Sequence, residues 1–294
     1  MTQHPSTRRM LQCWLLAAAT LCAAPATAQQ SRAVAADPGE SPTEAEEIAT
    51  AMTLWPAGSL GRQVRDDFKR LFSRPFRLRG REWILPGALA AGTGVAYALR
   101  DKVREEFQEH RSESRDDFLQ DVRVTGKGAF VPALAGVLAL VGSARGSARE
   151  KQTALLLIES FVGSAVYSAA GSTLLAAERP EDGDSVHFLD TDGHGVSLDT
   201  ALAASMIAPL DRAYFRPRPG EARGRRFWRR IGRGLLYLVP ALVAAQRINQ
   251  DKHWLPDVYL GYTTGLLVGR ALEAPYAEQR IEVRPSGAGV RLRF

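Results

Sequence analysis

One short segment combines a histidine, a carboxylate and an arginine at spacings that suit nucleophilic or acid–base chemistry: Arg247-Ile-Asn-Gln-Asp-Lys-His253-Trp-Leu-Pro-Asp257. A His and an Asp at this separation lie on one face of a helix or at one helix entry. The carboxylate of Asp257 would then hold one imidazole nitrogen of His253 and leave the other free as a nucleophile or base. The guanidinium of Arg247 would bind oxygens of a phosphate group. The same His–Asp spacing is also common in surface pairs without a chemical role, so both interpretations stand at this point.

Apolar stretches rich in Ala, Leu and Gly predict the helices that must position this segment. They are Trp83–Leu99, Gly128–Ala144, Thr153–Ala177, Thr200–Leu210, Gly234–Gln246 and Val258–Leu272. Several are short for a bilayer span, and strongly charged loops separate them. A basic amphipathic helix within residues 58–81 either lies on an anionic membrane or docks its apolar stripe on the core. The alternating tail predicts a short β-hairpin. We therefore expect an all-α, single-domain helical bundle with a C-terminal hairpin.

The N-terminus has the pattern of an export signal. A pair of arginines precedes an apolar run, and a small-residue cleavage pattern ends at Ala28. The 2 cysteines of the sequence fall within this signal, so we expect no disulfide, no thiol nucleophile and no Cys-ligated metal. The expected organisation is a signal peptide (1–28), a flexible leader (29–57), a helical domain (58–277) and a hairpin (278–294).

Positive charge is concentrated in Arg212–Arg233, whereas the whole chain carries a formal charge of +6. Export makes nucleic acid an unsuitable partner for this run, and contact with anionic lipid or with solvent fits better. A cleaved signal followed by six spans would put this run outside and the His253 segment in the cytoplasm, against the positive-inside rule. We therefore expect an exported, periplasmic or envelope-associated protein, with an integral membrane protein as the alternative.

The R-x5-H-x3-D pattern of Arg247, His253 and Asp257 resembles the third motif of the type 2 phosphatidic acid phosphatase (PAP2) superfamily. This superfamily includes bacterial acid phosphatases and vanadium haloperoxidases, and its motifs are K-x6-R-P, P-S-G-H and S-R-x5-H-x3-D. The resemblance runs from about Arg79 to Ala274. It implies an all-α PAP2-like bundle.

Two positions compete for the first of these motifs. Arg216-Pro217 leaves too little chain before the third motif for the intervening helix and loop, so we prefer Arg179-Pro180. This register places Ser197 and Asp199 on the second motif. It also exposes departures, because Ser172 stands where the family has Lys, Asp199 where it has the P-S-G-H histidine, and Gln246 where it has Ser.

The resemblance implies a role for each matched position. His253 would attack phosphorus to form a phosphohistidine, and Asp257 would orient it. Arg179 and Arg247, with backbone N–H groups around Ser197, would bind the phosphate oxygens. Asp199 would stand at the position of the general acid, where a carboxylate repels a dianionic substrate. The loss of a general acid typically costs about 10²–10⁴-fold in rate.

Three nearby residues could compensate for these departures. His194 could swing in as the acid, although a solvated loop histidine is the simpler interpretation of both His194 and His187. Lys252 or Arg212 could supply the missing positive charge.

The expected function is therefore hydrolysis of a phosphoric monoester, either a phosphorylated lipid, a pyrophosphate or a small phosphate ester, without a metal or other cofactor. The alternative is a catalytically inactive pseudo-phosphatase that serves as a binding or structural envelope protein. A haloperoxidase is disfavoured, because vanadate would also need the missing Lys and acid His.

Overall fold

The computed structural model describes residues 59–183, 189, 194–218 and 220–278. Within these ranges the chain is helical and contains no β-strand, which confirms the all-α prediction. The expected signal peptide and leader lie outside the described residues, as does the hairpin beyond Glu278. These three assignments remain predictions.

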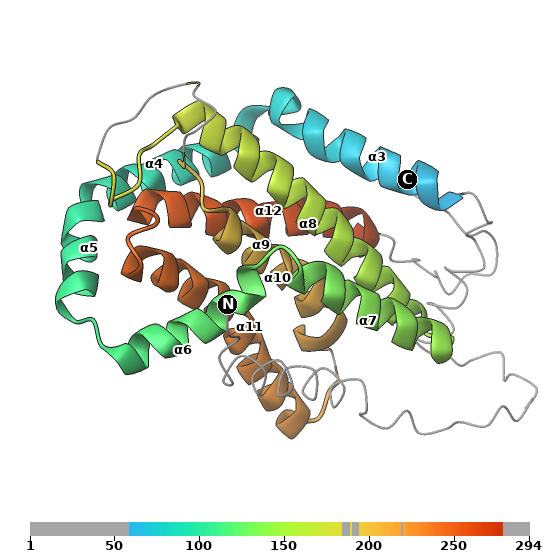
Figure 1. Ribbon diagram of the computed structural model, residues 1–294. Helices are drawn as coiled ribbons and strands as arrows, with labels where there is room; N and C mark the ends of the chain where they lie inside the picture. The colour runs from blue at the N-terminus through green and yellow to red at the C-terminus, as the bar shows by residue number, and fades with distance from the viewer. Residues whose placement is uncertain (1–58, 184–188, 190–193, 219, 279–294) are drawn as a thin grey trace, which may run out of the picture.

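Every apolar stretch that predicted a helix is helical. The corresponding elements are α4 (Ile84–Ala98), α7 (Phe130–Ala144), α8 (Ala148–Leu175), α9 (Leu198–Ser205), α10 (Ile207–Leu210), α11 (Arg223–Asn249) and α12 (Leu255–Glu278). The longer ones run along the length of the molecule, and α9 lies among them (Figure 1). The helix α11 begins well before the predicted Gly234, because the arginine-rich segment is itself helical from Arg223.

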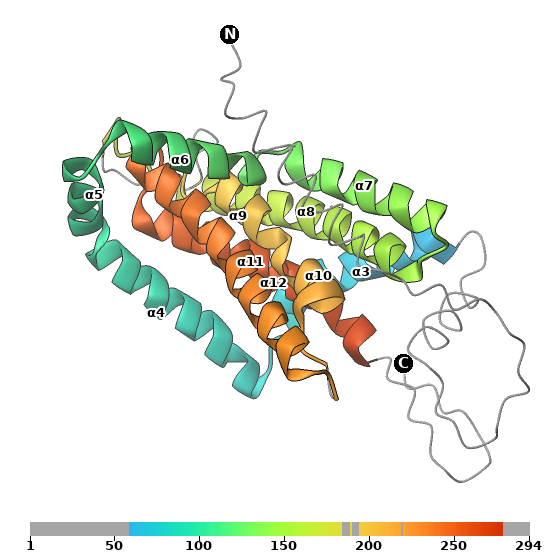
Figure 2. The same ribbon diagram turned by 90° about the horizontal axis from the view of Figure 1, so that it is seen from below.

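Two charged helices were not predicted. They are α5 (Arg100–Glu109) and α6 (Glu113–Arg123), and they follow each other around one end of the bundle (Figure 2). Ser112 caps α6 by accepting a hydrogen bond from the backbone N–H of Arg115. Short helical turns complete the path: η1 (Arg74–Arg77), η2 (Gly80–Trp83), η3 (Val124–Gly126) and η4 (Asp211–Phe215).

The centre of the bundle is the contact between α9 and α12. The α9 residues Ala201, Ala203 and Ala204 are fully buried. On α12, a Cβ added at Gly261 would collide with the carbonyl oxygen of Ser197, and one at Gly265 with that of Ala201. Small residues on both helices therefore let the two backbones approach closely. This approach fixes the first turn of α9 against the first turns of α12.

The helix α3 (Ser59–Ser73) docks its apolar stripe on the core, as one of the two alternatives predicted. Phe68, Leu71 and Phe72 pack with Tyr167 of α8 and with the α12 residues Val268 and Leu272. The Tyr167 hydroxyl also donates a hydrogen bond to the backbone oxygen of Leu71 at 3.0 Å. The basic side chains of α3 remain exposed on its outer face.

Much apolar side-chain surface points away from the core. Exposed large residues lie on α4 (Ile84, Leu85, Val95), on α8 (Ile158, Val162, Val166) and on α11 (Phe227, Trp228, Ile231, Leu235, Leu238). Among the described helices, α8 and α11 are long and apolar enough to cross a membrane. The segments Glu113–Gly126 and Phe130–Ala144, which are bent by 58° relative to each other, pass the same test when they are counted together as one broken span.

Candidate functional site

Three segments of the chain meet at the end of the bundle that carries α5 and α6. They are the loop after α8, the start of α9 and the turn between α11 and α12. The loop folds back after Ala176, which has a left-handed φ of 37°. The backbone N–H of His194 then donates to the carbonyl of Ala177 at 2.9 Å. The N–H of Ser197 donates to the carbonyl of Asp257 at 3.0 Å, which joins the starts of α9 and α12.

His253 and Asp257 lie together at the start of α12, and both are buried. The Nδ1 atom of His253 is 3.5 Å from Oδ2 of Asp257, and it has no hydrogen-bond partner in the part of the chain that the structure describes. The same Oδ2 accepts a 2.9 Å hydrogen bond from the backbone N–H of Trp254, as in a helix capping box. Asp257 therefore caps α12 and also faces Nδ1, so Nε2 is the nitrogen left for chemistry.

Asp199 is the counter-ion of two arginines. Its Oδ2 accepts a hydrogen bond from Nε of Arg123 at 2.9 Å and lies 3.5 Å from Nη1 of Arg247. Arg247 is largely buried, and the charges of Arg123 and Arg179 also act on it. Arg123 ends α6 and was not predicted as a site residue. The site thus places two guanidinium groups at the Asp199 carboxylate, with that of Arg179 close enough to act on Arg247.

His194 belongs to the site and is not the solvated loop residue that its sequence context favoured. Its Nε2 is 2.7 Å from Nη2 of Arg179, which can only donate, so Nε2 is the acceptor. Burial, followed by the charges of Arg179 and His253, lowers the pKa of His194 below its ordinary value. The imidazole is therefore neutral at pH 7. His187, the other loop histidine, lies outside the described residues.

The two serines at the predicted motif positions make structural contacts. Ser172, at the expected lysine position, bonds through Oγ to the backbone N–H and carbonyl of Val196 at 3.2 and 3.1 Å. It holds the loop to α8. The Ser197 hydroxyl is 3.0 Å from that of Thr200 and is fully buried, so Ser197 contributes its backbone position at the start of α9.

Neither predicted source of extra positive charge serves the site directly. Lys252 donates to both carboxylate oxygens of Glu181 at 2.6 and 2.7 Å. Arg212 lies in η4, which follows α10 and is separated from the start of α9 by the length of both helices. The added charge comes from Arg123 instead.

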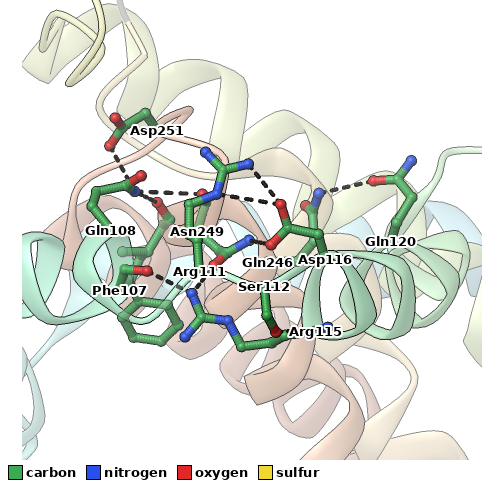
Figure 3. A network of polar contacts seen from close by, with 11 residues as sticks. Phe107, Gln108, Arg111, Ser112, Arg115, Asp116, Gln120, Gln246, Asn249 and Asp251 are labelled. Carbon is green, nitrogen blue, oxygen red and sulfur yellow. Dashed lines mark hydrogen bonds and ion pairs between the residues drawn. The ribbon is translucent and has the colours of Figure 1, made fainter.

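A polar network on α5 and α6 holds the end of α11, just before His253 (Figure 3). Asn249 is fully buried; its Nδ2 donates to Asp116 and its Oδ1 accepts from Arg115, both at 2.6 Å. Gln246 donates to Gln120 at 2.9 Å. Because these residues flank Arg247, the network sets where its guanidinium lies.

The turn after α11 is held by α5. Asp251 has a left-handed φ of 52°, and Arg104 binds both of its carboxylate oxygens at 2.8 and 3.0 Å. The Gln108 amide donates to the last carbonyls of α11, those of Ile248 and Asn249. The only sequence signal for α5 and α6 was a charged stretch with helically spaced apolar residues.

In the described part of the chain, no cluster of three or more His, Cys, Asp or Glu side chains is arranged to hold a metal ion.

Comparison with known proteins relates this arrangement to one fold. No protein-family profile matches the sequence, and no curated protein sequence matches it significantly. The transmembrane PAP2-type phosphatidylglycerolphosphate phosphatase of Bacillus subtilis is 15% identical with a TM-score of 0.50, over 68% of this chain and 98% of that one. LpxE of Aquifex aeolicus is 21% identical with a TM-score of 0.45, over 60% of this chain and 95% of that one. The chain therefore has the fold of the PAP2-type phosphatases, as its motifs predicted.

Proposed function

We propose that this protein is a PAP2-superfamily hydrolase of phosphoric monoesters, with a phosphorylated lipid as its substrate. One observation carries the proposal: residues of two separate predicted motifs, Arg179 of the first and Arg247 and His253 of the third, meet at one end of the bundle. The neighbour of known fold from Bacillus subtilis acts on phosphatidylglycerolphosphate, which supports a lipid phosphate over a soluble ester.

The proposed reaction has two steps. Nε2 of His253 attacks phosphorus, and the bond between phosphorus and the ester oxygen breaks. The leaving oxygen takes a proton from His194, which binding of a dianionic phosphate would help to protonate. Water then attacks the phosphohistidine and releases inorganic phosphate and free His253. Arg179, Arg247 and the backbone N–H groups at the start of α9 balance the charge on the phosphate oxygens.

A specific contact favours the second candidate function, an inactive binding protein with the same fold. The carboxylate of Asp199 lies among the arginines that would bind the phosphate, close to Arg123 and Arg247. An anion at this position competes with substrate and does not replace a general acid at neutral pH. The proposed hydrolase must therefore bind phosphate in spite of Asp199.

Phosphatase assays on the purified full-length chain separate the two candidates. We expect hydrolysis of phosphatidic acid that His253→Ala abolishes. His110→Ala is the matched control, because His110 is an exposed histidine on α5 and should leave the activity unchanged. Absence of activity in the unmodified protein would support the inactive alternative. Equal activity in the His253→Ala variant would show that the hydrolysis comes from elsewhere.

We also propose that the protein is exported and contacts a membrane through its α11 side. The outer face of α11 carries exposed aromatic and aliphatic residues, including Phe227, Trp228 and Leu235. The helix α3, with its basic outer face, lies on the opposite side of the bundle (Figure 1). Exposed apolar area of this extent is unfavourable in water and favourable against lipid.

A further inference from the structure

We propose that Asp199 is an internal anion that occupies the phosphate subsite when substrate is absent, and that Arg123 is an additional phosphate-binding residue. This inference rests on the proposed function, because it concerns the same site. Under this proposal Asp199 affects the affinity of the site for phosphate, and Arg123 of α6 contributes to phosphate binding.

The contacts support a shared subsite. The Oδ2 atom of Asp199 is 2.9 Å from Nε of Arg123 and 3.5 Å from Nη1 of Arg247. The first is a charge-assisted hydrogen bond and the second a close ion pair, and both are contacts that a phosphate oxygen can make with a guanidinium group. Both guanidinium groups are partly removed from solvent, so water screens them little and a counter-anion is favoured. Asp199 supplies this anion from the first turn of α9.

The carboxylate is not needed to hold α6 and α9 together. Val122 packs with Ala203 and Val243 in a buried cluster. Gly126 lies so close to the backbone oxygen of Asp199 that no side chain fits between them. These apolar and backbone contacts remain when the charge is removed. The Asp199→Asn variant should therefore fold, which makes it a usable probe.

The exchange of one anion for another has a measurable consequence. A bound phosphate must displace the Asp199 carboxylate from Arg123 and Arg247, because both anions use the same N–H donors. Asp199→Asn keeps the size of the side chain and removes its charge. The guanidinium groups then lack their internal counter-ion, and the affinity for inorganic phosphate should rise by about 10-fold or more.

The test is isothermal titration of the detergent-purified full-length chain with inorganic phosphate. We expect Asp199→Asn to bind phosphate about 10-fold more tightly than the unmodified protein. Asp66→Asn is the matched control: it removes the same charge from an exposed carboxylate on α3 that pairs with Arg65, and its affinity should not change. Arg123→Gln added to Asp199→Asn should remove most of the gain.

Several outcomes would overturn the proposal. These are equal or weaker phosphate binding by Asp199→Asn, no phosphate binding by either protein, or a gain that survives Arg123→Gln. Asp199→Ser removes the same charge with a smaller side chain and provides the second test, with circular dichroism to check folding. Because binding is read without turnover, tighter binding in a protein that hydrolyses nothing would sustain this inference while refuting the proposed hydrolase.

Discussion

Asp257 has two roles at the start of α12. It accepts a hydrogen bond from the N–H of Trp254 and faces Nδ1 of His253. The capping bond fixes the carboxylate independently of the imidazole, so Asp257 keeps its position beside Nδ1. The neighbouring His194 has no such support, because its partner is the cation Arg179. The two histidines therefore differ in their surroundings: His253 faces a carboxylate, and His194 faces a guanidinium group.

The role of His194 predicts an acidic activity profile. Burial and the charges of Arg179 and His253 lower the pKa of His194, so its protonated, donating form is present only at acidic pH. The kcat/KM should fall as the pH rises through this lowered pKa. His194→Gln should lower kcat by about 10²-fold or more and remove this pH dependence. The measurement is the pH–rate profile, with His110→Gln as the control. An unchanged profile in His194→Gln would exclude this donor.

At the scale of elements, α12 positions the site by its close contact with α9. Gly261 lies against the carbonyl of Ser197, and Gly265 against that of Ala201. A larger side chain on α12 would push α9 away and move its first turn relative to His253. Packing in the middle of the bundle thus determines the geometry at its end.

Gly265→Ala should therefore destabilise the protein, by about 1–3 kcal/mol, because the new methyl group overlaps the backbone of α9. The comparison is Gly136→Ala on α7, where a Cβ meets no atom within 4 Å. This control should be neutral or slightly stabilising, because alanine favours a helix more than glycine does. Thermal unfolding in detergent measures both. Equal melting temperatures for the two variants would contradict the tight α9–α12 contact.

At the scale of the whole molecule, charge and apolar surface are unevenly distributed. The helix α11 carries exposed arginines and aromatic residues in its first half and Arg247 at the other end. At 1.5 Å per residue the helix is roughly 40 Å long, so the arginine-rich half and the site occupy opposite ends.

Lipid contact through α11 predicts that its exposed arginines drive binding to anionic vesicles. Replacing Arg223, Arg225 and Arg230 together by Gln should weaken binding to phosphatidylserine-containing vesicles by about 10²-fold, at roughly 1 kcal/mol per arginine. The matched control replaces three basic residues on the outer face of α3, Arg62, Arg65 and Lys69. Vesicle co-sedimentation measures both. A larger loss in the α3 variant would place the membrane contact on the opposite side.

The sequence predicted those parts of the fold that depend on local pattern. Long apolar runs rich in Ala, Leu and Gly predicted α4, α7, α8 and α12, because such runs are typical of helices. The start of α11 was missed, since its arginine-rich first half is exposed and has no such pattern. The helices α5 and α6 were also missed. They are short and charged, and polar contacts with α11 and the turn after it help to hold them.

Local sequence pattern also predicted only part of the site. His253 and Asp257 were predictable, because four positions along one helix entry bring them together. Arg123 was not, because only the packing of α6 on α9 and α11 brings it to Asp199. His194 was recognised as a candidate, but its contact with Arg179 depends on how the loop after α8 folds back. Tertiary contacts of this kind leave no spacing signature in the sequence.

The network on α5 and α6 also bears on the order in which the protein folds. Asp116 and Asn249 are 133 residues apart, and Arg104 and Asp251 are 147 apart. Bringing such distant segments together costs chain entropy before any contact is gained, and it slows folding. During synthesis, α5 and α6 leave the ribosome long before α11 exists, and their buried polar groups must wait for it. The residues of the site therefore come together only after the final helices have docked.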